Sequence, residues 1–168
     1  EAISFMNENL DRPFFVNLWL YGVHAPFNAK TELVEKYREL LNDDSTHKNP
    51  LYAAMVEHTD RAIGKVLDAL DDLGISEQTL VIFTSDNGGN HFELAAFDHP
   101  TDNAPLRGGK ATIWEGGIRV PMIISWPGRI KPGERSKELV QTTDLFPTIL
   151  DALEVQPPAE AIIDGVSI

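Results

Sequence analysis

Two side chains with metal-binding oxygens stand directly after an apolar stretch of the sequence. Asp86 and Asn87 follow the run "TLVIFTS" and precede a pair of glycines. Carboxylate and amide oxygens suit hard cations such as Ca²⁺ or Mg²⁺. Because Ser-Asp-Asn-Gly-Gly is also good turn chemistry, the pair by itself favours a turn. A Ca²⁺ ion takes about six to eight oxygens, so a metal site here needs further ligands from elsewhere.

A lysine flanked by paired glycines lies in the stretch "LRGGKATIWEGGIR". Lys110 follows the first glycine pair directly, and Glu115 precedes the second. Glycines permit φ > 0 and a close approach of the backbone to a ligand. The lysine ammonium is a compact point charge. This arrangement indicates a loop built to receive an anion, while Glu115 and Arg119 are predicted to form an ion pair that fixes the second glycine turn.

His24 is the histidine whose position favours chemistry. It stands in "YGVHAPF", directly after the apolar run "PFFVNLWL". An imidazole there could donate a hydrogen bond to an anion or to a leaving oxygen. Of the other histidines, His47 and His58 are predicted to be structural or exposed, and His91 is a candidate substrate contact.

The elements that must position these residues alternate between strands and helices. Apolar runs predict strands over 13–20, 79–85 and 121–126, the first of them buried on both faces. Helical spacing predicts helices over 2–9, 32–41 (capped by Thr31), 52–73 (ended by Gly74) and 144–153. This order is typical of an α/β domain with a largely parallel sheet.

Such a sheet predicts one shared pocket for the chemistry. Ligands bind beyond the carboxyl ends of parallel strands, where His24 and the Asp86–Asn87 pair are expected. Lys110 comes 11 residues before Pro121, and a linker of that length spans roughly 35 Å, enough to reach the same edge. A cation, an imidazole and an ammonium together would stabilise a tetrahedral oxyanion ester.

Composition limits the classes of protein. The 168 residues carry a net charge of −12, which argues against general nucleic-acid binding. Seven basic and two acidic residues give segment 105–137 a charge of +5, leaving −17 for the rest. This segment either neutralises acidic neighbours or receives an anionic substrate. The chain has no cysteine, hence no disulfide or thiolate chemistry, and no apolar run approaches a membrane span.

Several stretches together resemble the sulfatases of the alkaline-phosphatase superfamily. They are "VHAPF", "FTSDNGG", "LRGGKATIWEGGIRVPMIISWPG", "TTDLFPTILDAL" and the terminal "DGVSI", in the family's order. The resemblance covers nearly the whole chain and implies an alkaline-phosphatase-like α/β fold. It implies that residues 1–168 form a single partial catalytic domain.

The resemblance also assigns roles to residues. It implies that Asp86 and Asn87 are two ligands of a Ca²⁺ ion and that His24 and Lys110 contact the sulfate group; Thr112 and Glu115 match the same lysine segment. The family's nucleophile is a formylglycine made from a Cys or Ser in a C/S-x-P-x-R segment. We expect that segment, with an early Asp-Asp pair, Lys and His, to lie outside this chain, and the isolated chain to be inactive.

The implied function is hydrolysis of sulfate esters, with sulfated carbohydrates as the implied substrates. The family further implies a periplasmic, secreted or lysosomal location. Two alternatives stay open. A phosphate or phosphonate ester hydrolase of the same superfamily would use the same metal and lysine, and a noncatalytic anion- or metal-binding module would need no nucleophile.

Overall fold

The computed structural model describes residues 1–45, 47–91 and 100–168. These residues form two compact units, Glu1–Ile130 and Lys131–Ile168. The expectation of one domain over 1–168 stays a prediction. Within the described ranges, no helix is both long enough and apolar enough to cross a bilayer.

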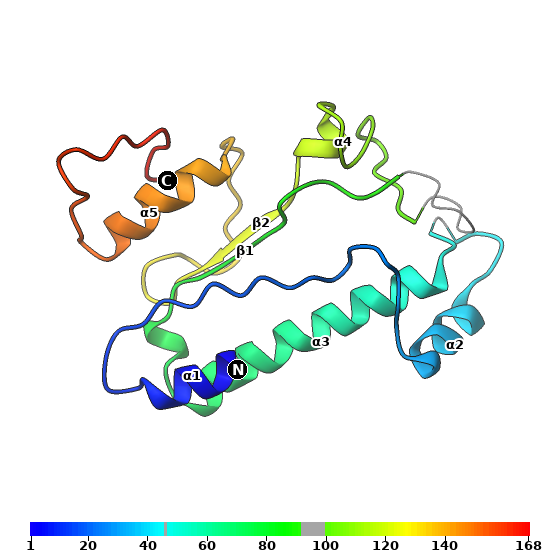
Figure 1. Cartoon of the computed structure of the whole chain (residues 1–168), viewed down its shortest axis with the longest axis horizontal. Helices are drawn as coiled ribbons and strands as arrows, with labels where there is room; N and C mark the ends of the chain where they lie inside the picture. Colours follow the sequence, from blue (N-terminus) through cyan, green and yellow to red (C-terminus); the bar gives the residue numbers. More distant parts are fainter. Residues whose placement is uncertain (46, 92–99) are drawn as a thin grey trace. The chain divides into compact units, whose positions relative to one another are not determined.

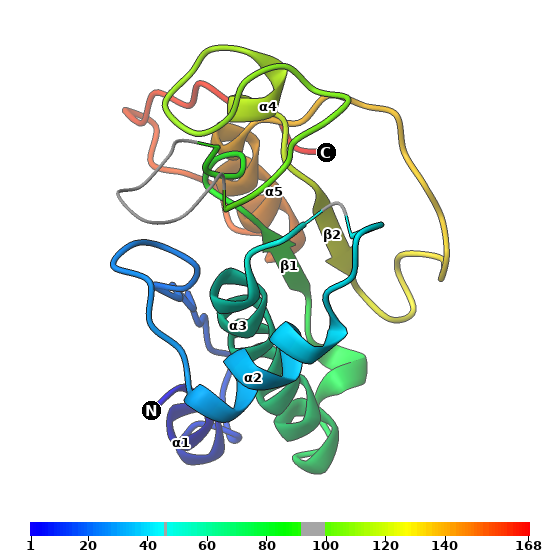
Figure 2. The same ribbon diagram turned by 90° about the vertical axis from the view of Figure 1, so that its right-hand side faces the viewer.

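The first unit is organised around one long helix (Figure 1). Its helices are α1 (Ala2–Glu8), α2 (Thr31–Leu40), α3 (Pro50–Asp72) and the short α4 (Glu115–Ile118). A 3₁₀ turn over Ser76–Gln78 leads from α3 to the strand β1 (Val81–Thr84), which pairs with β2 (Met122–Ser125). Both α1 and α2 pack on α3, and Figure 2 shows them beside it from a second direction.

Capping residues set the ends of α3 where the sequence places them. The Asn49 side chain accepts a hydrogen bond from the Tyr52 backbone N–H at 2.9 Å, and Pro50 occupies the first turn. Gly74 follows the helix with a φ of 69°, the left-handed conformation that glycine adopts without strain. The predicted cap of α2 is wrong, however. Thr31 lies inside that helix, because the Lys30 carbonyl already accepts the first hydrogen bonds.

The sheet differs from the predicted parallel one. Among the described residues, β1 and β2 form a two-stranded antiparallel sheet in which Val81 lies opposite Ser125 and Thr84 opposite Met122. The chain leaves the sheet at the end of β1, passes through α4 and re-enters at that same end of the sheet. β2 therefore runs in the opposite direction to β1. The carboxyl end of β1 therefore adjoins the amino end of β2.

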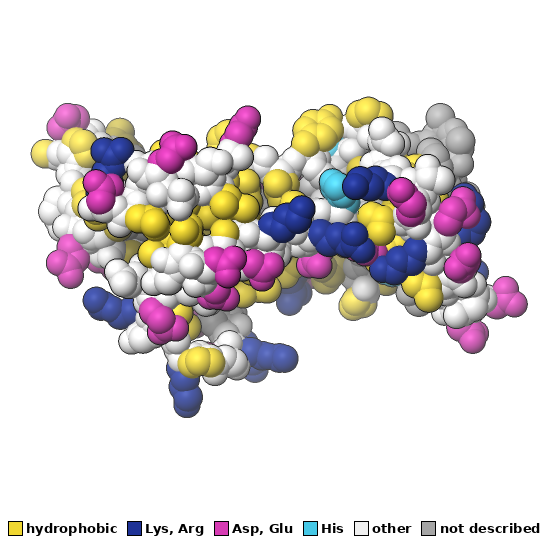
Figure 3. Space-filling view, turned by 90° about the horizontal axis from the view of Figure 1, so that it is seen from below, with side chains coloured by type: hydrophobic (Ala, Val, Ile, Leu, Met, Phe, Trp, Pro, Cys, Tyr) yellow, Lys and Arg dark blue, Asp and Glu magenta, His cyan; other side chains and the backbone are white. Residues whose placement is uncertain are grey.

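The segment 13–20 is not a strand buried on both faces. It runs extended without strand pairing among the described residues. Phe14 and Val16 pack against the core cluster of Met6, Ala69 and Leu70, whereas Trp19 on the same segment is 87% exposed. One face of the segment therefore meets the core. Apolar side chains also reach the surface elsewhere, as the yellow patches in Figure 3 show.

The second unit is built on α5 (Leu145–Ala152), preceded by a 3₁₀ turn over Thr142–Asp144. The helix is confirmed, with Pro147 in its first turn. Asp144 is buried and accepts hydrogen bonds from the backbone N–H groups of Gln141 (2.7 Å) and Val166 (3.0 Å), which lower its pKa. The irregular tail is thereby tied to the start of α5.

A charged cluster links α2 to α3 in the first unit. Lys36 lies 2.6 Å from Glu57. Hydrogen bonds from Lys36 and Tyr37 lower the pKa of Glu57 from 4.5 to about 2. A lowered carboxylate pKa contributes stability that is present above pH 4.5 and lost as the pH falls towards 2.

We therefore expect Glu57→Gln to flatten the fall in thermal stability over this acid range. The measurement is the melting temperature against pH for both proteins. Glu39→Gln, which changes an exposed carboxylate on α2, is the control and should leave the slope unchanged. A slope that is the same for wild type and Glu57→Gln would contradict the assignment.

Candidate functional site

Two glycine-rich loops pack directly on one another at the α4 end of the first unit. Gly88 donates its N–H to the Gly117 carbonyl at 2.9 Å, and Lys110 donates its N–H to the Gly89 carbonyl at 3.0 Å. These bonds join the loop that follows β1 to the loop that carries the lysine. The backbone at Asn87 and the backbone at Lys110 are therefore held in fixed relation.

The glycines are needed because the two backbones come too close for side chains. A Cβ on Gly88 would overlap the Gly116 carbonyl. A Cβ on Gly109 would overlap the Gly89 carbonyl and the His91 ring. The sequence predicted a close approach of this backbone to an anion, which stays a prediction. The structure shows a close approach of one loop to the other.

Side chains that the sequence analysis did not select complete this packing. Asn103 donates from Nδ2 to the carbonyls of Gly89 (2.9 Å) and Gly108 (3.1 Å), so that one amide holds both loops. Thr101 donates to the Asn90 carbonyl at 2.8 Å. In "TDNAP" these residues read as ordinary turn chemistry, and only the folded backbone shows what they bind.

The predicted metal pair and the predicted anion-binding lysine come together in this packing. Asp86 is exposed, whereas Asn87 and Lys110 are half-buried. The Ser85 hydroxyl donates to the Asn87 carbonyl at 2.9 Å and fixes the turn. Within the described part of the chain, the side chains of Asp86, Asn87 and Lys110 form no hydrogen bond and no ion pair. Their oxygens and ammonium are available for a ligand.

These oxygens fit part of a Ca²⁺ site. A carboxylate and an amide oxygen on adjacent residues are hard donors of the type that Ca²⁺ prefers. The residues that the structure describes contain no cluster of three or more histidine and acidic side chains arranged to hold a metal ion. The pair therefore fits a shared site that needs ligands from outside the described residues.

His24 stands on a separate segment, the turn after residues 13–20. Its backbone N–H donates to the Tyr21 carbonyl at 3.1 Å, and its Nδ1 lies 2.7 Å from the Ala25 carbonyl. That contact requires a proton on Nδ1, so Nε2 is the ring atom left to meet a ligand. Nε2 donates a hydrogen bond only when the ring is doubly protonated. No hydrogen bond between described residues links His24 to the glycine loops.

The ion pair of Glu115 and Arg119 exists, but it does not fix the glycine turn. Their charged atoms lie 3.3 Å apart, and both side chains are more than 60% exposed. Exposed pairs contribute about 0–1 kcal/mol. The second glycine pair lies within α4, held by the bonds from Gly116 to the Arg107 carbonyl and from Gly117 to the Trp114 carbonyl. The expectation that the pair fixes this segment is therefore corrected.

One stretch contradicts the expectation that the C/S-x-P-x-R letters lie outside this chain. Residues 125–129 read "SWPGR" and fit that pattern. Ser125 pairs with Val81, at the far end of the sheet from Thr84, which precedes the metal pair. Three residues of strand separate the two ends by about 10 Å. This serine therefore does not stand beside Asp86 and Asn87, and its match to the pattern carries no role at this site.

The sequence of this chain is similar to those of known sulfatases. The sulfatase family model matches residues 1–155. Steryl-sulfatase of Rattus norvegicus is 39% identical over 167 residues, covering 98% of this chain and 27% of the rat protein. N-acetylgalactosamine-6-sulfatase of Canis lupus familiaris is 36% identical, covering 100% of this chain and 30% of the dog protein.

Solved structures agree with these sequence matches. The structure of Ps i-CgsB in complex with k-i-k-neocarrahexaose superposes with a TM-score of 0.85 at 32% identity, covering 98% of this chain and 35% of that one. The PsFucS1 sulfatase from Pseudoalteromonas sp. gives 0.77 at 30% identity, covering 98% of this chain and 31% of that one. The fold is thus the alkaline-phosphatase-like α/β fold of the sulfatases, in part. This chain belongs to the sulfatase family, and it spans about 27–30% of the length of these curated relatives.

Proposed function

We propose that this chain is part of an enzyme that hydrolyses sulfate esters and that it supplies one side of the sulfate-binding site. The observation that carries the proposal is the hydrogen bond from Lys110 to the Gly89 carbonyl. This bond joins the backbone that carries Lys110 to the loop that carries the Asp86–Asn87 pair, within a chain of the sulfatase family.

Each residue has a distinct role in the proposed site. Lys110 places a positive charge against the sulfate oxygens, where negative charge is concentrated as the ester bond breaks. His24, when its ring is doubly protonated, donates from Nε2 to the sulfate or to the leaving oxygen. Asp86 and Asn87 would hold a Ca²⁺ ion together with ligands from outside the described residues, and a bound Ca²⁺ ion would supply Lewis-acid chemistry at the sulfate. A formylglycine nucleophile would come from residues other than those of this chain.

Carbohydrate sulfates are the proposed substrates. One structural neighbour is in complex with a carrahexaose, and another relative is named for a sulfated amino sugar. The net charge of +5 over 105–137 suits a polyanionic chain. A periplasmic, secreted or lysosomal location goes with this proposal and stays a prediction.

An assay of the full-length protein with an aryl sulfate and the matching aryl phosphate tests the proposal. We expect the sulfate to be hydrolysed at least about 100-fold faster, and a chelator to abolish this activity until Ca²⁺ is restored. Faster hydrolysis of the phosphate would instead identify a phosphate ester hydrolase. Absence of turnover on both esters, with Ca²⁺ bound, would identify a noncatalytic module.

A further inference from the structure

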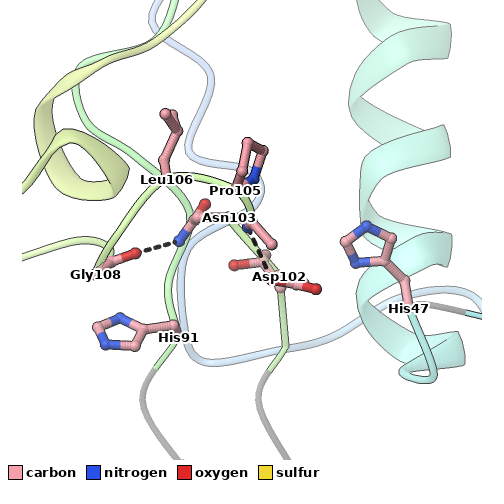
Figure 4. Close-up of a pocket in the computed structure, with 9 residues that line it drawn as sticks. His47, His91, Asp102, Asn103, Pro105, Leu106 and Gly108 are labelled. Carbon is pink, nitrogen blue, oxygen red and sulfur yellow. Dashed lines mark hydrogen bonds between the residues drawn. The ribbon is translucent and has the colours of Figure 1, made fainter.

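A pocket of about 440 Å³ lies beside the glycine loops. Its volume falls within the range of about 300–1,000 Å³ that is common for small-molecule sites. His47, from the loop before α3, and His91, from the loop after β1, come from opposite sides in Figure 4, with Asp102 between them. All three side chains bear polar atoms, and Asp102 and His47 are exposed to solvent.

The pocket adjoins the proposed sulfate site through the backbone. Gly108 lines it and stands two residues before Lys110. His91 also lines it, and its ring lies so close to Gly109 that a Cβ there would overlap it. A group held in this pocket therefore lies against the backbone segment that carries Lys110, the residue proposed to meet the sulfate. In a sulfate ester, the group next to the sulfate is the alcohol that carries it.

The pocket lining matches the chemistry of a sugar ring. Asp102 uses Oδ1 to accept the Ala104 N–H at 2.9 Å, which leaves Oδ2 to accept from hydroxyl groups. An imidazole can both donate to and accept from a hydroxyl. Pro105 and Leu106 add apolar surface that can cover the C–H face of a ring. A steroid or a simple aryl group would form no hydrogen bonds with Asp102 and His47, whose polar atoms would stay exposed to water.

We propose that this pocket binds the sugar unit that carries the sulfate, with Asp102 and His47 recognising its hydroxyl groups. This inference rests on the proposed function, and it names the substrate class through residues of this chain. Asp102 and His47 thereby determine specificity for sugar esters. Neither is needed to bind the sulfate itself.

Asp102→Asn in the full-length protein is the sharpest test. The asparagine Oδ1 can still accept the Ala104 N–H, so the turn is kept while the charged acceptor is lost. We expect KM to rise about 10-fold or more for the carrageenan or glycosaminoglycan hexasaccharide that the wild type desulfates fastest, because a lost hydrogen bond to a charged group has that effect. For an aryl sulfate, kcat and KM should both stay within about 2-fold. His47→Gln should show the same split.

The control is Asp44→Asn, which removes the same charge from an exposed residue outside the pocket. It should change neither substrate. If Asp102→Asn and His47→Gln alter both substrates equally, or neither, the sugar subsite is overturned while the proposed function stands. Wild-type activity on the aryl sulfate but on none of the hexasaccharides would also overturn the subsite. Wild-type inactivity on every sulfate ester would overturn the proposed function itself.

Discussion

Replacing Lys110 with alanine in the full-length protein is expected to lower kcat/KM for an aryl sulfate by about 10²–10³, or roughly 3–4 kcal/mol of transition-state stabilisation. The backbone of Lys110 is held by the Gly89 carbonyl, and that bond does not depend on the side chain. The ammonium itself takes no carboxylate partner among the described residues, so its loss leaves no buried charge unpaired. The melting temperature should therefore change little while catalysis falls.

Two further variants make this result specific. Lys110→Arg should not restore full activity, because a planar guanidinium does not replace a point charge in a closely packed loop. Lys137→Ala removes an exposed lysine from the same basic segment and should leave kcat/KM unchanged. If Lys110→Ala lowered activity only in proportion to lost folded protein, its role would be structural. Purified samples compared by kinetics and thermal melts separate the two outcomes.

Local signals in the sequence were sufficient for α1, α2, α3 and α5, but they did not predict the short α4. Asn49 before α3, Pro50 in its first turn and Gly74 after it fix the ends of this helix, because such caps depend only on residues that are close in sequence. The direction of β2 in the sheet was harder to predict from the sequence. It depends on the path of the nearly 40 residues that connect β1 to β2, and this path is not set by local signals. Residues 13–20 show the same limit. Their apolar pattern indicates burial, but only the packing partner decides that Phe14 is covered and Trp19 exposed.

Residue chemistry suggested candidate ligands: an aspartate and an asparagine after a strand, which by themselves also favour a turn, and a lysine after two glycines. Their roles as ligands stay predictions. The residues that hold the site together were not predictable in this way. Asn103 joins two carbonyls that lie 14 and 5 residues away in sequence. Gly88 is needed because Gly116, far along the chain, lies against it. Such roles depend on distant contacts rather than on residue type.

The carboxylate of Asp86 gives the second large expected effect. Asp86→Ala in the full-length protein should release Ca²⁺ at concentrations that saturate the wild type. Loss of the ion should remove several kcal/mol of charge stabilisation, or roughly a 10³-fold or greater loss of activity. The exposed Asp86 side chain takes part in no hydrogen bond among the described residues, so the fold should survive its removal. Calorimetric titration with Ca²⁺ and the aryl sulfate assay measure both effects.

If Asp86 is a Ca²⁺ ligand, the activity of its variant should depend on the Ca²⁺ concentration, which a purely structural role does not predict. If Asp86 acts through the ion, high Ca²⁺ should partly restore the activity of Asp86→Ala, because the remaining ligands still bind weakly. Asp60→Ala removes an exposed carboxylate from α3 and should alter neither affinity nor activity. Unchanged Ca²⁺ affinity in Asp86→Ala would show that the turn after β1 is only a turn. The lysine would then have to meet the sulfate without a metal held by this loop.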